Sequence, residues 1–206
     1  MMYTMKKLIN LLENISKIKF NFIQIIFSLI FFSSFQLFAT EKWIIDKNAS
    51  YIKFELPVLF ANNVKGEFKE ISGFVELNLD NKNNNKAIIS VDISSIEINY
   101  EKYLDLLLSE IFFDLNKYPL GVIDTKSFKY ENENELSLLV ELTIKGISKE
   151  IAVPINVNEL SRDFVQIKTK FNFSRNDYNI GIGQWSNTAI LKDNITVSAN
   201  IFLFKE

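Results

Sequence analysis

A polar corner near the C-terminus is the clearest candidate for chemistry in this chain. Arg175 and Asp177 follow an alternation of apolar and polar residues that ends at Phe173, as expected at the end of a half-buried strand. Gly181 and Gly183 come next, and glycine adopts backbone conformations that other residues resist. An arginine at such a corner suits a phosphate or another ligand group that accepts hydrogen bonds, because its guanidinium donates several hydrogen bonds. The structural alternative is that Arg175 and Asp177 pair and bind the free backbone groups of the corner.

Most other chemistry is excluded because the chain has neither cysteine nor histidine. Disulfides, thiolate nucleophiles, Cys/His zinc sites, a cysteine-linked lipid anchor and Ser-His-Asp catalysis are therefore impossible. An enzyme would have to use carboxylates, Lys, Tyr or an oxygen-ligated metal. The acidic candidates are Asp92, Asp105, Asp114 and Asp124. Their spacing does not indicate that these carboxylates lie close together in the fold. We therefore predict no catalytic residues, no metal ligands and no cofactor.

The first 39 residues are typical of a secretory signal peptide. Four lysines precede a largely apolar run from residue 20 to Ala39, and a small residue at the end of such a run suits signal peptidase. We therefore predict a signal peptide over residues 1–39, a mature domain over residues 40–206, and a periplasmic or secreted protein. The alternative is an uncleaved membrane anchor, because about 20 apolar residues span a bilayer core.

The charge of the mature chain argues against nucleic acid. Residues 40–206 contain 19 basic and 24 acidic residues, a net charge of −5, and no basic stripe. Phosphate backbones are bound by clustered Lys and Arg, and anionic membranes attract the same groups. We therefore expect no nucleic-acid partner and only transient contact with membranes.

Strand-like alternation covers most of the mature chain. Hydrophobic residues recur at every second position in several segments separated by short polar turns, which predicts an antiparallel barrel or sandwich. The clearest hairpin joins residues 136–144 to residues 151–157 through Lys145 and Gly146. Segment 195–203 is the closing strand, and Phe74, Phe202 and Phe204 face outward under this alternation.

One segment has helical spacing instead. Tyr100, Tyr103 and Leu107 recur at intervals of three to four residues up to Ile111, and Asn99 is placed to cap the first turn. We predict a single amphipathic helix that covers one end of the sheet structure. It is also the expected partner for the outward-facing phenylalanines.

Five short motifs resemble, in order, those of the YceI-like family of exported lipid-binding barrels. They are the opening strand Trp43–Asp46 with Ser50–Phe54, Val64–Phe68 with Ser72–Phe74, Leu108–Asp114 with Tyr118–Pro119, Leu142–Gly146 with Lys149, and the corner at Arg175, Asp177, Tyr178 and Gly181. The resemblance covers residues 42–205. It implies a single eight-stranded antiparallel, lipocalin-like β-barrel, with the helix between two blocks of strands, around a polyisoprenoid such as a quinone tail or carrier lipid.

The function expected from this resemblance is to sequester or transport a long apolar lipid. An eight-stranded barrel either fills with side chains or holds one small ligand. The candidate ligand contacts on the inward face are Phe54, Val75, Leu77, Val91, Leu142, Val153, Phe171, Phe173 and Ile201, with Phe112, Phe113 and Trp185 near one end and Arg175 at the corner. Two alternatives remain: a filled barrel that binds protein through its outer face, and a cofactor-free carboxylate enzyme.

Overall fold

Eleven strands make up a single antiparallel sheet in the computed structural model, which describes residues 41–59, 62–79, 82–129 and 136–206. The strands are β1 (Glu41–Ile45), β2 (Tyr51–Leu56), β3 (Val64–Phe68), β4 (Ile71–Leu77), β5 (Asn85–Asp92), β6 (Ile96–Ile98), β7 (Leu120–Phe128), β8 (Leu136–Ile144), β9 (Ile147–Ser161), β10 (Phe164–Ser174) and β11 (Asn194–Lys205). The predicted signal peptide lies outside the described residues. Within them, no helix is long and apolar enough to cross a membrane.

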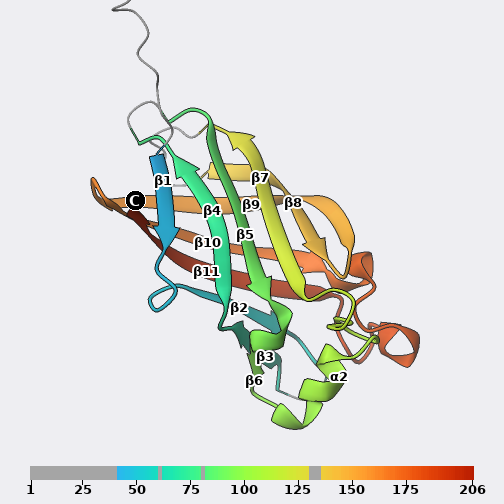
Figure 1. The fold of residues 1–206 in the computed structure, drawn as a ribbon. Helices are drawn as coiled ribbons and strands as arrows, with labels where there is room; N and C mark the ends of the chain where they lie inside the picture. The colour runs from blue at the N-terminus through green and yellow to red at the C-terminus, as the bar shows by residue number, and fades with distance from the viewer. Residues whose placement is uncertain (1–40, 60–61, 80–81, 130–135) are drawn as a thin grey trace, which may run out of the picture. The chain divides into compact units, whose positions relative to one another are not determined.

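The sheet closes on itself as an eight-stranded barrel. Neighbouring strands follow the order β1–β4–β5–β7–β8–β9–β10–β11, and β1 also pairs with β11, with Trp43 opposite Lys205 and Ile45 opposite Leu203. Figure 1 shows β1, β4, β5 and β7 in front of β8 to β11, which cross behind them. The predicted antiparallel barrel is confirmed. Closure removes the free edges that an open sheet would expose.

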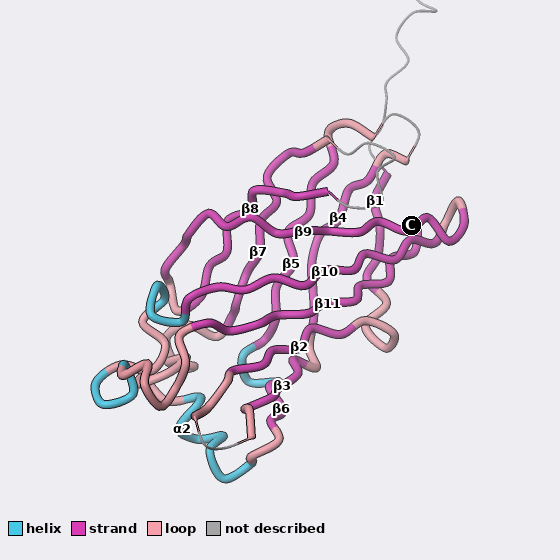
Figure 2. The backbone as a smooth tube through the Cα atoms, turned by 180° about the vertical axis from the view of Figure 1, so that it is seen from behind, coloured by secondary structure: helices cyan, strands magenta, loops and turns pink. Residues whose placement is uncertain are grey.

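The first three barrel strands are each broken into two parts. β1 continues as β2, β3 as β4, and β5 as β6, so that β2, β3 and β6 form an extension hydrogen-bonded to β11. β6 is the last strand of that extension and pairs only with β3. The segment between β6 and β7 lies at the same end of the barrel as this extension, as Figures 1 and 2 show. Side chains rather than a strand pairing therefore close this end.

The covering helix is shorter than predicted. A 3₁₀ turn (Glu101–Tyr103) leads into α2 (Leu104–Leu108), which has five residues and no side-chain cap. Asn99 does not cap it. Its side chain instead accepts from the Lys65 amide and donates to the Asn63 carbonyl, 2.9 and 3.0 Å away. Asn99 thus ties the start of the segment to β3, and the helix begins later than its hydrophobic spacing suggests.

The buried side chains form two clusters along the barrel. The small cluster joins β1, β4, β10 and β11, with Trp43, Leu77, Val165 and Leu203 among its most buried members. The large cluster occupies the other end, where residues of β2, β8 and β10 meet the segment that follows α2. Leu104, Leu106, Leu107 and Leu108 of α2 are partly buried against this large cluster. The helix therefore covers one end of the barrel, as predicted.

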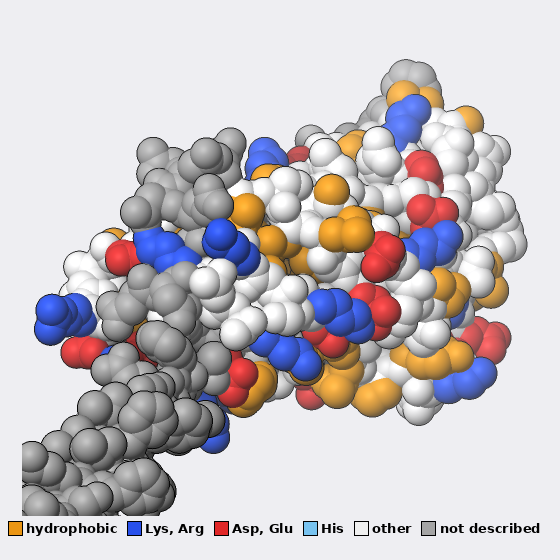
Figure 3. Space-filling model, turned by 90° about the horizontal axis from the view of Figure 1, so that it is seen from above, with side chains coloured by type: hydrophobic (Ala, Val, Ile, Leu, Met, Phe, Trp, Pro, Cys, Tyr) orange, Lys and Arg blue, Asp and Glu red, His pale blue; other side chains and the backbone are white. Residues whose placement is uncertain are grey.

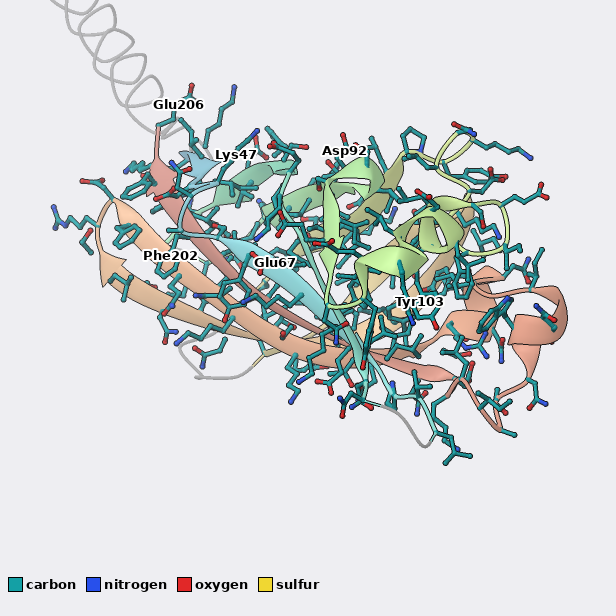
Figure 4. All side chains as sticks on the ribbon, turned by 90° about the horizontal axis from the view of Figure 1, so that it is seen from below. Lys47, Glu67, Asp92, Tyr103, Phe202 and Glu206 are labelled. Atoms are coloured by element: carbon teal, nitrogen blue, oxygen red, sulfur yellow. The ribbon has the colours of Figure 1, made fainter. Side chains whose placement is uncertain are left out.

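The outward-facing phenylalanines of β11 pack on a neighbouring strand rather than on the helix. The Phe164 ring of β10 stacks on Phe204 and Phe202, with centroids 4.5 and 5.6 Å apart. Phe204 is still 43% exposed and Phe74 42% exposed. In Figure 4, Phe202 and Glu206 lie toward one end of the molecule and Tyr103 toward the other. The expected contact between the helix and these phenylalanines is therefore wrong, because α2 covers the opposite end.

Candidate functional site: an apolar cavity under the α2 segment

The barrel encloses a cavity of about 110 Å³ within the large cluster. Every side chain that lines it is apolar, so the cavity offers no hydrogen-bond partner to a polar ligand group. The lining residues are Ile52, Phe54, Leu56, Val64, Phe68, Ile89, Val91, Ile93, Leu107, Phe112, Phe113, Gly121, Val122, Ile123, Leu142, Ile144, Phe171, Phe173, Ile180, Ile195 and Val197.

Seven of the residues predicted from the sequence to contact ligand lie around this cavity, and six do not. The seven are Phe54, Val91, Phe112, Phe113, Leu142, Phe171 and Phe173. Val75, Leu77 and Ile201 belong to the small cluster at the other end. Val153 is buried in the large cluster without lining the cavity. Trp185 lines a second pocket, and Arg175 lies in the corner, as described below.

Phe54 reaches its place in the cavity wall because of a glycine on the neighbouring strand. Gly66 pairs with Phe54 across β2 and β3. A Cβ atom at Gly66 would overlap the Phe54 ring, so only glycine lets the ring lie against the β3 backbone. The Phe54 and Phe68 rings then meet with centroids 5.9 Å apart. The glycine of the Val64–Phe68 motif thus shapes the cavity wall.

Some lining residues were missed, although the sequence carries a signal for part of them. Ile52 and Leu56 share the inward face of β2 with Phe54, and strand alternation alone places them there. Leu107 and Ile180 come from the α2 segment and the corner, outside any strand. No strand period locates such residues, because their position depends on how the loops pack on the barrel.

Arg175 is a buried structural residue in this fold. Its side chain is 0% exposed. The guanidinium donates to the carbonyls of Lys192, Ile180, Gly181 and Leu191 at 2.9, 2.8, 3.2 and 2.9 Å. Burial lowers the pKa of Arg175, and the nearby carboxylate of Asp193 partly offsets this effect. These four bonds join the two ends of the loop between β10 and β11 and so fix the corner next to the cavity.

The expected pair between Arg175 and Asp177 is absent. The Asp177 carboxylate lies 3.3 Å from Lys149 Nζ on β9 instead. Gly181 has a φ of +77°, and a Cβ there would approach Arg175 Nη1 to 2.8 Å and the Phe112 ring to 3.2 Å. The glycine therefore lets both the arginine and a cavity-lining ring lie close to the corner backbone.

Tyr178 completes the corner with a hydroxyl that makes no hydrogen bond in the described structure. Its ring packs edge-on against Phe173, with centroids 5.3 Å apart, and is 1% exposed. Burial, with a smaller contribution from Asp177, raises the pKa of Tyr178 to about 12. The phenol therefore stays neutral at physiological pH and acts mainly as a hydrophobic side chain.

A second pocket, which we call the outer pocket, borders α2 and shares part of its lining with the cavity. It has a volume of about 260 Å³ and includes the polar side chains of Asn62, Tyr100, Lys102 and Tyr103. The Trp185 ring lines it and lies 5.9 Å from the Phe112 ring, centroid to centroid. Lys102 Nζ lies 4.9 Å from the Tyr103 ring centroid. Aromatic rings and hydrogen-bonding groups thus meet at the mouth of the barrel.

The carboxylates considered for catalysis are dispersed. Asp92 accepts from the amide and hydroxyl of Ser94, which lowers its pKa, and Asp124 accepts from the Lys126 amide with the same effect. Neither lines the cavity. Across the described ranges, no cluster of three or more acidic groups is placed to hold a metal ion. On the face seen in Figure 3, basic and acidic side chains are interspersed.

Comparison with known proteins gives a family and a fold. The chain matches the YceI-like domain over residues 43–203. It is 24% identical over 111 residues to Protein YceI of Salmonella newport (strain SL254), a match that covers 53% of this chain and 58% of that protein. The chain therefore spans less than two thirds of the length of this relative.

Two solved structures share the fold. The crystal structure of Burkholderia cenocepacia BcnA has a TM-score of 0.71 and 21% identity, covering 77% of this chain and 98% of that one. A polyisoprenoid-binding domain from Saccharophagus degradans, implicated in plant cell wall breakdown, has a TM-score of 0.65 and 15% identity, covering 80% of this chain and 98% of that one. At these identities the likeness concerns the fold alone.

Proposed function

We propose that this chain, which belongs to the YceI-like family, binds the apolar chain of an isoprenoid lipid in its barrel and carries or sequesters it outside the cytoplasm. The observation that carries the proposal is the cavity lining, which contains no polar side chain. Each CH₂ group buried from water contributes about 0.8 kcal/mol, offset by the ordering of a flexible ligand. The polyisoprenoid-binding domain of Saccharophagus degradans, which has the same fold, supports this choice of ligand class.

The proposed function is binding rather than catalysis. The charged groups of the neighbouring corner are engaged elsewhere, because Arg175 donates to backbone carbonyls and Asp177 pairs with Lys149. The cavity itself has neither acid nor base. A carboxylate enzyme would need at least two ionisable groups converging on a pocket that substrate can reach.

The interaction alternative is favoured by one observation, the exposed phenylalanines at the end opposite α2. Phe204 and Phe74 are each more than two-fifths exposed. That alternative, however, requires a barrel filled with side chains. Because this barrel has a cavity under α2, we favour lipid binding over the interaction alternative.

The test is mass spectrometry of an organic extract of the purified protein. We expect lipids with an isoprene-repeat mass series, present in the extract of the wild type and depleted in a Val197→Trp variant. Val197 lines the cavity, so an indole there would occupy the space of the ligand. An extract free of isoprenoid lipid, together with no uptake of a short-chain ubiquinone in solution, would refute the proposed function.

Export is tested separately. If residues 1–39 are a cleaved signal peptide, intact-mass measurement of protein from the culture medium or periplasm should give a chain that begins near Thr40. A full-length product that fractionates with membranes would identify the segment as an anchor. Lipid binding by the barrel could still hold in that case.

A further inference from the structure

The cavity and the outer pocket share part of their walls. Four residues line both spaces: Leu56, Val64, Leu107 and Phe112. The cavity alone is smaller than the roughly 150 Å³ engineered cavity that admits benzene, and ligand pockets commonly measure about 300–1,000 Å³. A lipid chain therefore needs both spaces, and it can reach them together only by displacing this wall.

The wall contains a weakly held part. Leu107 belongs to α2, and neither α2 nor the turn before it contains a fully buried residue. The chain after α2 is held firmly, because Ile111 accepts from the amides of Gly181 and Ile182, and Lys145 Nζ donates to the Glu110 carbonyl at 2.6 Å. A segment with little burial beside a well-bonded one opens at low cost. The carbonyls of Leu107 and Leu108 also accept from the amides of Phe113 and Leu115, at 3.1 and 3.0 Å. The structure thus favours movement of residues 100–106 and of the Leu107 side chain about this anchored part.

The opposite end of the barrel offers no such passage in its described residues. Val165 and Leu203 are 0% exposed, and Trp43 donates to the Leu77 carbonyl across β1 and β4 at 3.3 Å. Opening this end would break the strand pairs that close the barrel. An apolar chain inside the cavity therefore ends against the small cluster.

The distribution of polar groups sets the orientation of the ligand. A head group inside the cavity would lose its hydration without gaining a partner, at a cost of a few kcal/mol. In the outer pocket the hydroxyl of Tyr103 and the side-chain amide of Asn62 can donate hydrogen bonds, while Trp185 offers an aromatic face. The Tyr100 hydroxyl donates to the Asn62 carbonyl at 3.5 Å. These groups suit a flat head group that accepts hydrogen bonds.

Resting on the proposed function, we propose that the cavity and the outer pocket are one lipid site with a gate at Leu107 and Phe112. The lipid enters tail first through this gate, its tail ends at the small cluster, and its head group stays in the outer pocket beside Tyr100, Tyr103 and Trp185. The small cluster thereby limits how much of the chain the barrel encloses, and the remainder stays at the mouth.

The two tryptophans of the chain allow a direct test of orientation, because Trp43 is in the small cluster and Trp185 lines the outer pocket. The probe is a ubiquinone with two isoprene units, whose quinone quenches tryptophan fluorescence at short range. It is added to Trp43→Phe, which keeps only Trp185, and to Trp185→Phe, which keeps only Trp43. Emission is compared at equal occupancy, measured by equilibrium dialysis.

We expect strong quenching of Trp185 and little quenching of Trp43. Preferential quenching of Trp43, or binding that quenches neither tryptophan, would overturn the orientation while leaving the proposed function intact. Failure of the wild-type protein to bind the probe in dialysis, with no isoprenoid in its extract, would overturn the proposed function and the gate with it.

The gate is tested by the rate of quenching in stopped-flow measurements on the Trp43→Phe background. Leu107→Ala and Phe112→Ala should each raise the association and dissociation rates together, by about tenfold, equivalent to about 1.4 kcal/mol of barrier. The control is Val153→Ala, which truncates a buried residue of the same cluster that lines neither space. Leu107 is only partly buried, so Leu107→Ala remains informative if Phe112→Ala fails to fold. Unchanged rates in Leu107→Ala, or an equal rise in Val153→Ala, would overturn the gate.

Discussion

The two ends of this barrel are built from the same inward alternation, yet one is packed and the other is hollow. At the packed end, strand pairing closes the ring, with β1 between β4 and β11, and the small cluster fills the space between them. At the hollow end β6 has only one neighbour, and a short helical segment covers the opening. Both ends are lined by apolar residues of the same alternation, so the difference between them lies in strand pairing rather than in residue type.

The comparison also shows how a family motif can serve the fold rather than the ligand. Arg175 and Gly181 belong to the corner by which the family is recognised, yet the arginine binds four carbonyls and the glycine makes room for it and for Phe112. The corner thus fixes the position of the residues that border the cavity, such as Phe112 and Ile180. Its contribution to binding is to position the residues around it.

The largest expected effect is a charge placed in the packed end. Ile201→Asp puts a carboxylate into the small cluster, where Ile201 is 3% exposed, and we expect a loss of about 4 kcal/mol or more in unfolding free energy. Asn200→Asp, one position away, should change stability by less than about 1 kcal/mol, since an aspartate can still accept from Gln166 Nε2. Urea denaturation of both variants measures the difference. Equal losses would show that the inward face of β11 is misassigned.

An intermediate effect separates the two ends directly. Val75 is in the small cluster and Val197 lines the cavity. Val75→Trp should cost about 1–3 kcal/mol or more through overpacking, with little direct effect on a ligand. Val197→Trp places its ring partly in existing space, so it should lose less stability than Val75→Trp and should also lose bound lipid.

Thermal denaturation and extraction of lipid from both variants decide the outcome. A heavy loss of stability in both would mean that the hollow end has no usable space. Retained lipid in Val197→Trp, with stability intact, would place the ligand elsewhere.

Strand alternation was sufficient to predict an antiparallel barrel or sandwich and its inward face, and the family resemblance selected the barrel, but neither showed which part of that face is hollow. Val75, Leu77 and Val91 all follow the same period, and only Val91 borders the cavity. The two-residue period shows which face of the sheet a side chain is on. The volume inside a barrel depends instead on how far apart opposite strands lie. Local pattern does not reveal that distance, because it depends on strands that are far apart in the sequence.

Polar partners were predicted less well than the strands, for a related reason. The sequence predicted that Asn99 caps the start of the helix and that Arg175 pairs with Asp177, because these partners are nearby in sequence. In the folded chain Asn99 binds the backbone of Lys65 and Asn63. Arg175 binds backbone carbonyls of the corner, as the structural alternative predicted, but without pairing with Asp177. Buried backbone carbonyls need donors, and their positions are known only once the loops have packed.

The smallest expected effect concerns Tyr178, which lies beside Arg175 in the corner. Tyr178→Phe removes a buried hydroxyl that has no hydrogen-bond partner in the described structure. The change at neutral pH should therefore be within about 1 kcal/mol and favourable in sign, because a buried hydroxyl without a partner carries a desolvation cost. A marked loss of stability would reveal a partner, such as a bound water, for this hydroxyl.

The pH dependence of the same variant supplies a second measurement. The pKa of Tyr178 is raised from 10.0 to about 12, so between these values the folded state holds a proton that the unfolded state releases. Stability must then fall as the pH rises through this window, since the unfolded state binds fewer protons. Phenylalanine cannot ionise, and Tyr178→Phe should lose less stability than the wild type between pH 9 and about 11. Parallel losses in guanidinium denaturation would show that the phenol ionises as freely in the folded corner as in water, and that the corner is open to solvent rather than packed against the hollow end.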